Sequence, residues 1–503
     1  MRKRKLIQST IAVMIKYVVF MVIGLITPRL IIQYYGSAVN GLVNSITQFL
    51  GYISLLDMGL NAVVASSLYA PLAKKDDAEV SRIVVSCDRF YKKIALALLG
   101  YSVIIMIVYP LVVKSEFDFA YIAVLVLAIA LNSFLQYFLG VTWMILLEAD
   151  QRIYVKHYIE TFVAFISLLC SIALIRGGFS IQAVKLAASV VFIIKPLLLS
   201  IYVKRNYHIN KKIKLDGEPI KQKKNGIAHH LAYTVFSSTD VTILTLFSSL
   251  EAVSVYSVYF LAVNAVSELV RTLSYSVTSL IGNMLSKEEF SRLKEFFKCY
   301  VWGMHFITVA AFSTAAVAIR SFVRIYTKGV NDANYDAPVF ALVLVLAYAV
   351  FTVRIPYKQL INAAGHYKQT QNSAIIEMVL NLTISIVLVL KFDMLGVAVG
   401  TLVAMVYRTA YFVKYVSKNI LFVEPAYFLK LCINDIVSIA VILVETRFMT
   451  FKADNFMEWA MASICFGIVY AATSFIITAI FNRKEFTASC RMIMNKSSGR
   501  NSA

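Results

Sequence analysis

The sequence predicts an all-α integral membrane protein with about fourteen transmembrane helices. Of its 503 residues, 59% are hydrophobic and 15% are charged, whereas a soluble domain carries about 25% charged residues. The apolar residues are grouped in long runs, and a run of about 20 is needed to cross the hydrocarbon core of a bilayer. These runs predict spans at 7–31, 41–68, 93–113, 119–146, 157–175, 181–203, 227–248, 253–281, 298–319, 337–363, 372–390, 395–416, 429–446 and 457–481.

Lysines and arginines are concentrated in alternate connections between the predicted spans. About 29 lie on one side, in the MRKRK start, the 69–92 and 204–226 loops and the tail among others, and about 8 lie on the other side. Because basic loops stay in the cytoplasm, both termini are expected there. The net charge of +21 therefore indicates orientation and contact with anionic phospholipids, and no nucleic-acid binding is expected.

The chain contains an internal repeat with an offset of about 214 residues. Glu160 falls within a few residues of Glu377 under this offset, and Lys195 within one of Arg408. Each copy has six spans, an even number, so a pseudo-two-fold axis along the membrane normal is expected to relate them. The predicted parts are a bundle at 1–203, a basic cytoplasmic linker at 204–226, a second bundle at 227–420, and two added helices with a basic tail at 421–503.

Three stretches resemble the polysaccharide repeat-unit flippases of the multidrug, oligosaccharidyl-lipid and polysaccharide exporter superfamily. Stretch 34–77 has a YG turn, a D-x-G-L element and a cytoplasmic Lys/Asp end. In 239–266 an Asp opens the element and a YS pair follows, and 360–404 has an alanine-glycine turn, an Asn and a helix-opening Gly. The matching residues are Tyr35–Gly36, Asp57–Leu60, Lys74–Asp77, Asp240, Tyr256–Ser257, Asn381 and Gly396.

This resemblance implies a MATE-like fold, in which two six-helix bundles face each other around a central cavity. It also implies a cargo, an oligosaccharide on undecaprenyl pyrophosphate, which moves by alternating access to the outer leaflet of the bacterial cytoplasmic membrane. Polysaccharide polymerase machinery is then an expected partner, and Na⁺ or a proton is an expected coupling ion. No cofactor is expected.

Basic residues within the spans are the candidates for binding the pyrophosphate, because ionisable groups in a bilayer are costly and usually functional. Arg354 and Lys358 are four residues apart and share a helix face. Pro356 between them has no backbone N–H to donate, which predicts a kink. Arg271 and Lys16 are expected to approach the same anion from other helices.

Structural roles compete with these assignments. Charged residues within spans also pair between neighbouring helices or snorkel toward an interface. The alternatives are ion pairs of Arg354 and Lys358 with Glu377, of Glu268 with Arg271 and of Glu377 with Arg408, a helix-packing pair for Lys16, and a snorkelling Lys185 near an outer helix end.

Two carboxylates at membrane depth are the candidates for ion coupling. Asp240 is flanked by serines and threonines, whose hydroxyls can join a carboxylate in holding Na⁺ or a proton, or can instead satisfy backbone groups. Asp57 lies two residues before Gly59, which permits close helix approach, so a structural role competes here too.

Two other function classes stay open. A cation-coupled multidrug or organic-cation antiporter of the same fold needs a net acidic cavity, whereas a lipid pyrophosphate needs Lys and Arg. A membrane glycan polymerase usually needs a substantial outer loop, and the longest expected outer loop is only 320–336. The sequence has no P-loop, no catalytic constellation and no Cys/His cluster, so neither an enzyme nor a metal site is expected.

Overall fold

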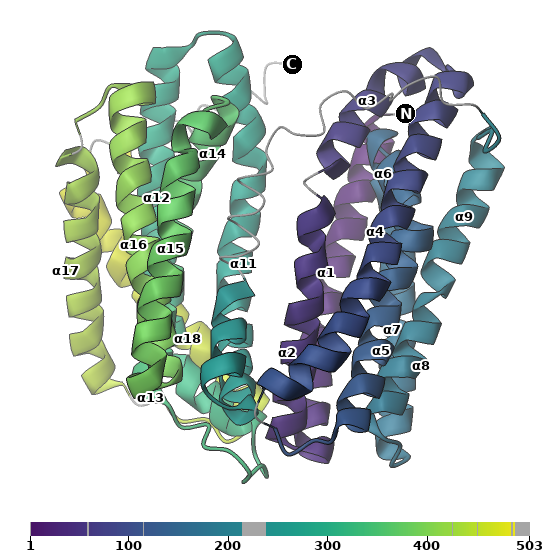
Figure 1. The fold of residues 1–503 in the computed structure, drawn as a ribbon. Coiled ribbons are helices and arrows are strands. Elements are labelled where there is room, and N and C mark those ends of the chain that lie inside the picture. The colour runs from purple at the N-terminus through teal and green to yellow at the C-terminus, as the bar shows by residue number, and fades with distance from the viewer. Residues whose placement is uncertain are drawn as a thin grey trace. The chain divides into compact units, whose positions relative to one another are not determined.

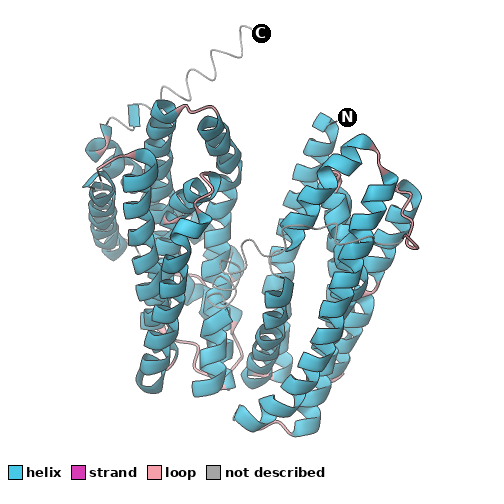
Figure 2. Ribbon diagram, turned by 45° about the horizontal axis from the view of Figure 1, so that its top comes forward, coloured by secondary structure: helices cyan, strands magenta, loops and turns pink. Residues whose placement is uncertain are grey.

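The computed structural model of the protein describes residues 2–57, 60–113, 115–213, 238–424, 426–449, 451–483 and 486–487. Within these ranges every regular element is a helix and no strand occurs (Figure 2). The chain forms two compact units. Unit 1 is Met1–Val255 with Gly329–Ala333, and unit 2 is Tyr256–Lys328 with Asn334–Ala503. The division at 203, 227 and 420 stays a prediction.

Twelve described helices are long and apolar enough to cross a membrane, so the chain is a multi-pass membrane protein. They correspond to twelve of the predicted spans. The span predicted at 41–68 is divided into helices α2 (Ser37–Gly51) and α3 (Leu60–Lys74), joined through the 3₁₀ turn η1 (Tyr52–Asp57). Residues 58 and 59 lie outside the described part of the chain. Of the span at 227–248, only the short apolar helix Ser238–Phe247 is described.

The remaining helices of unit 1 pack around one apolar core. They are α1 (Arg2–Tyr35), α4 (Asp77–Val112), α5 (Phe119–Leu135), the π turn η2 (Gln136–Gly140), α6 (Val141–Ala149), α7 (Ile153–Arg176), α8 (Ile181–Phe192) and α9 (Ile194–Asn206). Helix α1 packs against α7, α4 against α5, and α8 against both α5 and α7 (Figure 1). Leu42, Ile46 and Leu98 are fully or almost fully buried in this core, so tight packing of branched side chains holds the bundle.

Unit 2 contains the later helices. They are α11 (Leu250–Ser286, whose first turns belong to unit 1), α12 (Phe290–Tyr326), α13 (Pro338–Val353), α14 (Ile355–Ala363), α15 (Tyr367–Phe392), α16 (Met394–Val416), the π turn η3 (Ser417–Leu421), α17 (Ala426–Phe448) and α18 (Phe456–Phe481). Helix α16 packs against α13 and α15, and α17 and α18 both pack against α12. The last two helices therefore join unit 2 through α12.

The helix boundaries repeat along the chain. A shift of 214 residues moves α4 onto 291–326, and α12 covers Phe290–Tyr326. The same shift moves α7 onto 367–390, where α15 covers Tyr367–Phe392. The packing of α8 on α5 and α7 is likewise repeated by α16 on α13 and α15. The internal repeat inferred from the sequence is thus present as a repeated order and packing of helices.

Two spans are interrupted where a proline removes a backbone donor. The predicted kink is found at Arg354, where α13 ends, and α14 then begins with Pro356 in its first turn. In unit 1 the break between α8 and α9 falls at Ile193, three residues before Pro196. Each break places a basic residue, Arg354 or Lys195, inside the bundle, where both are almost fully buried.

The first turn of α2 is capped by a residue distant in the sequence. Gly36 precedes the helix with φ 91°, a conformation that favours glycine, and it has no side chain to cap the helix. Asp332 supplies the cap instead. One of its carboxylate oxygens accepts from the backbone N–H of Ser37 at 2.6 Å and the other from the Ser37 hydroxyl at 2.7 Å. Segment Gly329–Ala333 thereby belongs to unit 1, although its flanking residues belong to unit 2.

Candidate functional site

A cavity of about 680 Å³ lies inside unit 1. It is lined by residues of α1, α3, α5, η2, α6, α7, α8 and α9, so every element that lines it belongs to unit 1. Its charged lining consists of four lysines and two glutamates, which leaves an excess of two positive charges. These residues are Lys16, Lys156, Lys185, Lys195, Glu148 and Glu160.

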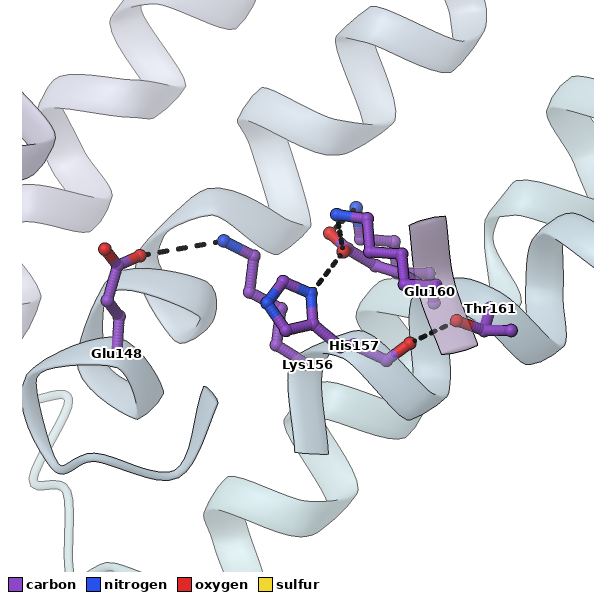
Figure 3. Close-up of polar contacts among 7 residues, drawn as sticks. Glu148, Lys156, His157, Glu160 and Thr161 are labelled. Atoms are coloured by element: carbon purple, nitrogen blue, oxygen red, sulfur yellow. Dashed lines mark hydrogen bonds and ion pairs between the residues drawn. The ribbon is translucent and has the colours of Figure 1, made fainter. Parts of the chain in front are cut away.

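Glu160 on α7 is the centre of the charged lining, and Figure 3 shows its contacts. One carboxylate oxygen lies 2.7 Å from the ammonium of Lys16 on α1, and the other lies 3.0 Å from that of Lys195 on α9. His157, one turn earlier on α7, places Nδ1 at 3.3 Å from the carboxylate. Three helices are thereby joined through one carboxylate. Lys16 lines the cavity and also forms an ion pair between helices, so both of the roles considered for it are present.

The other charged groups of the cavity are held less tightly. Lys156 and Glu148 approach to 3.6 Å, and the Glu148 side chain is 52% exposed (Figure 3). Within the described residues Lys185 has no ion-pair partner, although it lines the cavity. Lys185 was expected to snorkel outward, and its place in the cavity wall corrects that expectation. An unpaired ammonium at this depth needs water or an anion beside it.

Neutral polar groups line the cavity between the charged residues and the apolar walls. They come from α1, α3, α5, η2 and α7, and their amides and hydroxyls can both donate and accept hydrogen bonds. Such groups suit a ligand rich in hydroxyls. They are Thr27, Asn61, Asn132, Ser133, Gln136, Tyr137, Ser167 and Ser171.

Unit 2 contains an ion-pair cluster at the equivalent position of the repeat. Glu377 on α15 accepts hydrogen bonds from Arg354 and, at 3.2 Å, from Arg408 on α16. All three side chains are less than 10% exposed. The sequence alternatives that paired Arg354 and Arg408 with Glu377 are therefore confirmed. Glu377 with Arg408 repeats Glu160 with Lys195, as the 214-residue offset indicated.

The structure places three of the four predicted anion-site residues near one another. The charge of Lys358 interacts with those of Arg271 and Arg354, and its side chain is exposed. Arg271 also contacts Glu268 at 2.5 Å, the pairing within α11 that was its structural alternative. Lys16, the fourth residue, lies in the cavity of unit 1. The assignment of Arg271, Arg354 and Lys358 to an anion site stays a prediction.

The two predicted coupling residues differ in what the structure describes. Asp240 lies in helix Ser238–Phe247 and is 8% exposed. The Tyr52 hydroxyl is within 2.8 Å of the Thr242 hydroxyl and donates to the backbone carbonyl of Ser238 at 3.3 Å. Asp240 therefore lies on the same short helix as Ser238 and Thr242, and its role in ion coupling stays a prediction. Asp57 ends η1, and its side chain lies outside the described part of the chain.

Solved structures show what this architecture resembles, whereas no protein-family model and no curated protein matches the sequence. The lipid II flippase MurJ, in an inward closed conformation, has a TM-score of 0.69 at 16% identity, over 95% of this chain and 99% of that chain. An inward-facing multidrug resistance MATE family transporter of the MOP superfamily has a TM-score of 0.63 at 13% identity, over 82% and 98%. A Vibrio cholerae MATE transporter has 0.58 at 15%, over 84% and 98%.

The chain has the MATE/MurJ-type transporter fold. This confirms the fold that the sequence resemblance implied. The match to MurJ covers 95% of this chain and so leaves out only a twentieth of it. Residues 421–503 are a larger share than that, so the match includes part of the two added helices. Each unit buries a carboxylate among cations, and in unit 1 this cluster lines the cavity. The charge of that cavity is therefore the feature from which a function can be argued.

Proposed function

We propose that the chain flips an oligosaccharide repeat unit, linked to undecaprenyl pyrophosphate, from the cytoplasmic to the outer leaflet for polysaccharide biosynthesis. The supporting observation is the excess of lysines over carboxylates in the cavity of unit 1. A pyrophosphate brings negative charge, and charge-assisted hydrogen bonds from lysine are strong where water is scarce. The neutral amides and hydroxyls of the same cavity suit the sugar part of the cargo.

The cavity charge weighs against a drug or organic-cation antiporter of the same fold. A cationic substrate entering this cavity meets four ammonium groups, and the carboxylate of Glu160 is already engaged by Lys16 and Lys195. A glycan polymerase is disfavoured because it usually needs a substantial outer loop, and the connection expected to be the longest outer loop is only residues 327–337, between α12 and α13.

The proposal includes an orientation, a coupling ion and partners. Both termini are placed in the bacterial cytoplasm, with anionic phospholipids at the basic loops and polysaccharide polymerase machinery at the outer face. Asp240 is proposed to carry the Na⁺ or proton, with Asp57 as a second candidate. An Asp240→Asn variant should flip cargo at a rate that no longer depends on either ion gradient, and an unchanged dependence would remove Asp240 from the mechanism.

The decisive experiment is flipping of a fluorescent polyprenyl-pyrophosphate oligosaccharide in proteoliposomes. The wild-type protein should move it between leaflets, whereas Lys16→Gln and Lys195→Gln should slow this movement about tenfold or more. Lys368→Gln, which changes an exposed lysine outside the cavity, is the matched control and should be unaffected. No flipping by the wild type, together with export of an organic cation, would replace the proposal with the antiporter.

A further inference from the structure

The carboxylate of Glu160 occupies the position at which an anion would be held by two lysines of the cavity. Lys16 and Lys195 approach its two oxygens from two different helices, at 2.7 and 3.0 Å. A phosphate bound by two lysines likewise places two of its oxygens between two ammonium groups. The two lysines are thus already arranged for such a ligand, and a carboxylate of the chain itself fills the place.

The equivalent cluster of unit 2 differs in the chemistry of its cations. There Glu377 is bound by two guanidinium groups, of Arg354 and Arg408. A guanidinium binds a carboxylate as a planar, rigid fork, whereas an ammonium is a point charge with three rotatable donors that exchanges partners readily. By the chemistry of its cations, the cluster of unit 2 is therefore the more rigid one and that of unit 1 is better suited to exchange.

Exposure supports the same distinction. The difference lies in one residue: the side chain of Lys16 is 26% exposed and lines the cavity, whereas Lys195 and Glu160 are at most 10% exposed, as are Arg354, Arg408 and Glu377. A ligand in the cavity thus reaches Lys16 without unfolding the bundle.

A displaced Glu160 would still have compensating groups nearby. Lys156 lies four residues earlier on α7 and so shares its helix face, and it also lines the cavity. His157 is already within 3.3 Å. Moving the carboxylate away from Lys16 and Lys195 therefore does not leave it alone in an apolar setting.

We infer that Glu160 is an internal substitute for the cargo's phosphate, and that a phosphate or pyrophosphate group displaces it from between Lys16 and Lys195. This inference rests on the proposed function and adds a residue that competes with the substrate. The exchange replaces the two ion pairs that join Glu160 of α7 to α1 and to α9 with contacts to the ligand. Occupation of the cavity is thereby linked to how these three helices are held together.

The test is binding of inorganic pyrophosphate to the purified full-length protein, measured by calorimetry without any transport. Glu160→Gln removes the competing charge and should tighten binding about tenfold. Lys16→Gln and Lys195→Gln should weaken it by a similar factor. Glu160→Asp keeps the negative charge for folding, but its shorter side chain cannot contact both lysines, so it should give a smaller increase in affinity.

Glu148→Gln is the matched control, because it removes one negative charge from the same cavity without a contact to Lys16 or Lys195. Equal tightening in Glu148→Gln and Glu160→Gln would overturn the inference in favour of overall cavity charge. Unchanged or weaker binding in folded Glu160→Gln or Glu160→Asp would overturn it as well. Failure of the proposed function appears separately, as absence of flipping by the wild-type protein.

Discussion

At the scale of single residues, the main feature of the protein is a carboxylate buried among cations in each unit. Neither Glu160 nor Glu377 is more than 10% exposed. Removing a charge from water costs several kcal/mol, and only close partners recover that cost. The ion pairs therefore stabilise the fold as well as being candidate binding groups. Variants that are tested for both stability and binding separate the two roles.

Glu377→Gln is expected to destabilise unit 2 strongly. It leaves Arg354 and Arg408 buried without their counter-charge, and breaking a buried pair from one side costs about 3–5 kcal/mol. Unfolding in mixed detergent and SDS micelles measures this change. Glu289→Gln is the control, since its partner Arg292 is 73% exposed and the loss should stay below about 1 kcal/mol. Equal losses in the two variants would contradict the prediction.

Lys358→Gln tests the predicted anion site without disturbing a buried pair. Its side chain is exposed, so the unfolding midpoint should change less than in Arg354→Gln, whereas binding of the lipid-linked substrate should weaken about tenfold. Arg354→Gln and the double variant should lose both binding and stability, because Arg354 contacts Glu377. Wild-type binding and surface delivery of the glycan in Lys358→Gln would remove this residue from the site.

At the scale of helices, short polar signals fix where some of the spans begin. Asp76 accepts from the N–H of Glu79 at the start of α4, and Asp118 accepts from that of Tyr121 at the start of α5. Such caps satisfy backbone donors that the helix itself leaves unpaired. Helix α2 is capped differently, because its cap comes from residue 332, almost 300 positions later.

Asp332→Ala is expected to loosen the first turn of α2. Loss of an N-cap costs about 0.5–2 kcal/mol, and hydrogen exchange at the Ser37 amide should become faster. Asp332→Asn retains one accepting oxygen and should have a smaller effect. Unaltered exchange in Asp332→Ala would show that this cap does not stabilise the turn.

At the scale of the whole molecule, the surface is that of a protein in lipid. Large apolar side chains are widely exposed, among them Leu111 at 80% and Val18 at 64%. Lipid tails are as apolar as these side chains, so no free energy is gained by burying them. Orientation in the bilayer is then determined by the basic loops.

The predicted topology is tested by cysteine labelling in a variant without the six native cysteines. A cysteine in place of Lys211 should react only with reagent supplied from the cytoplasm, and one in place of Asn331 only from outside. The reason is the excess of lysines and arginines in the connections expected in the cytoplasm, which include the 204–226 loop. Labelling of position 331 from the cytoplasmic side would reverse the orientation.

Much of the fold was determined by the sequence itself. Apolar runs predict the spans because a bilayer leaves few other ways to satisfy the backbone. The 214-residue offset, read from weak similarities, paired Glu160 with Glu377 and Lys195 with Arg408, and both clusters are found. Pro356 predicted the break between α13 and α14 because a missing N–H acts locally.

Only the tertiary structure decided which charges share a site. Lys16, Glu160 and Lys195 lie on three helices, and the sequence does not state which faces of those helices meet. Lys185 was assigned to snorkelling from its position near a helix end, whereas packing of α8 on α5 and α7 turns it into the cavity. Local backbone chemistry is encoded by neighbours in the chain. The charge of a cavity arises from residues brought together by packing, which a one-dimensional pattern does not specify.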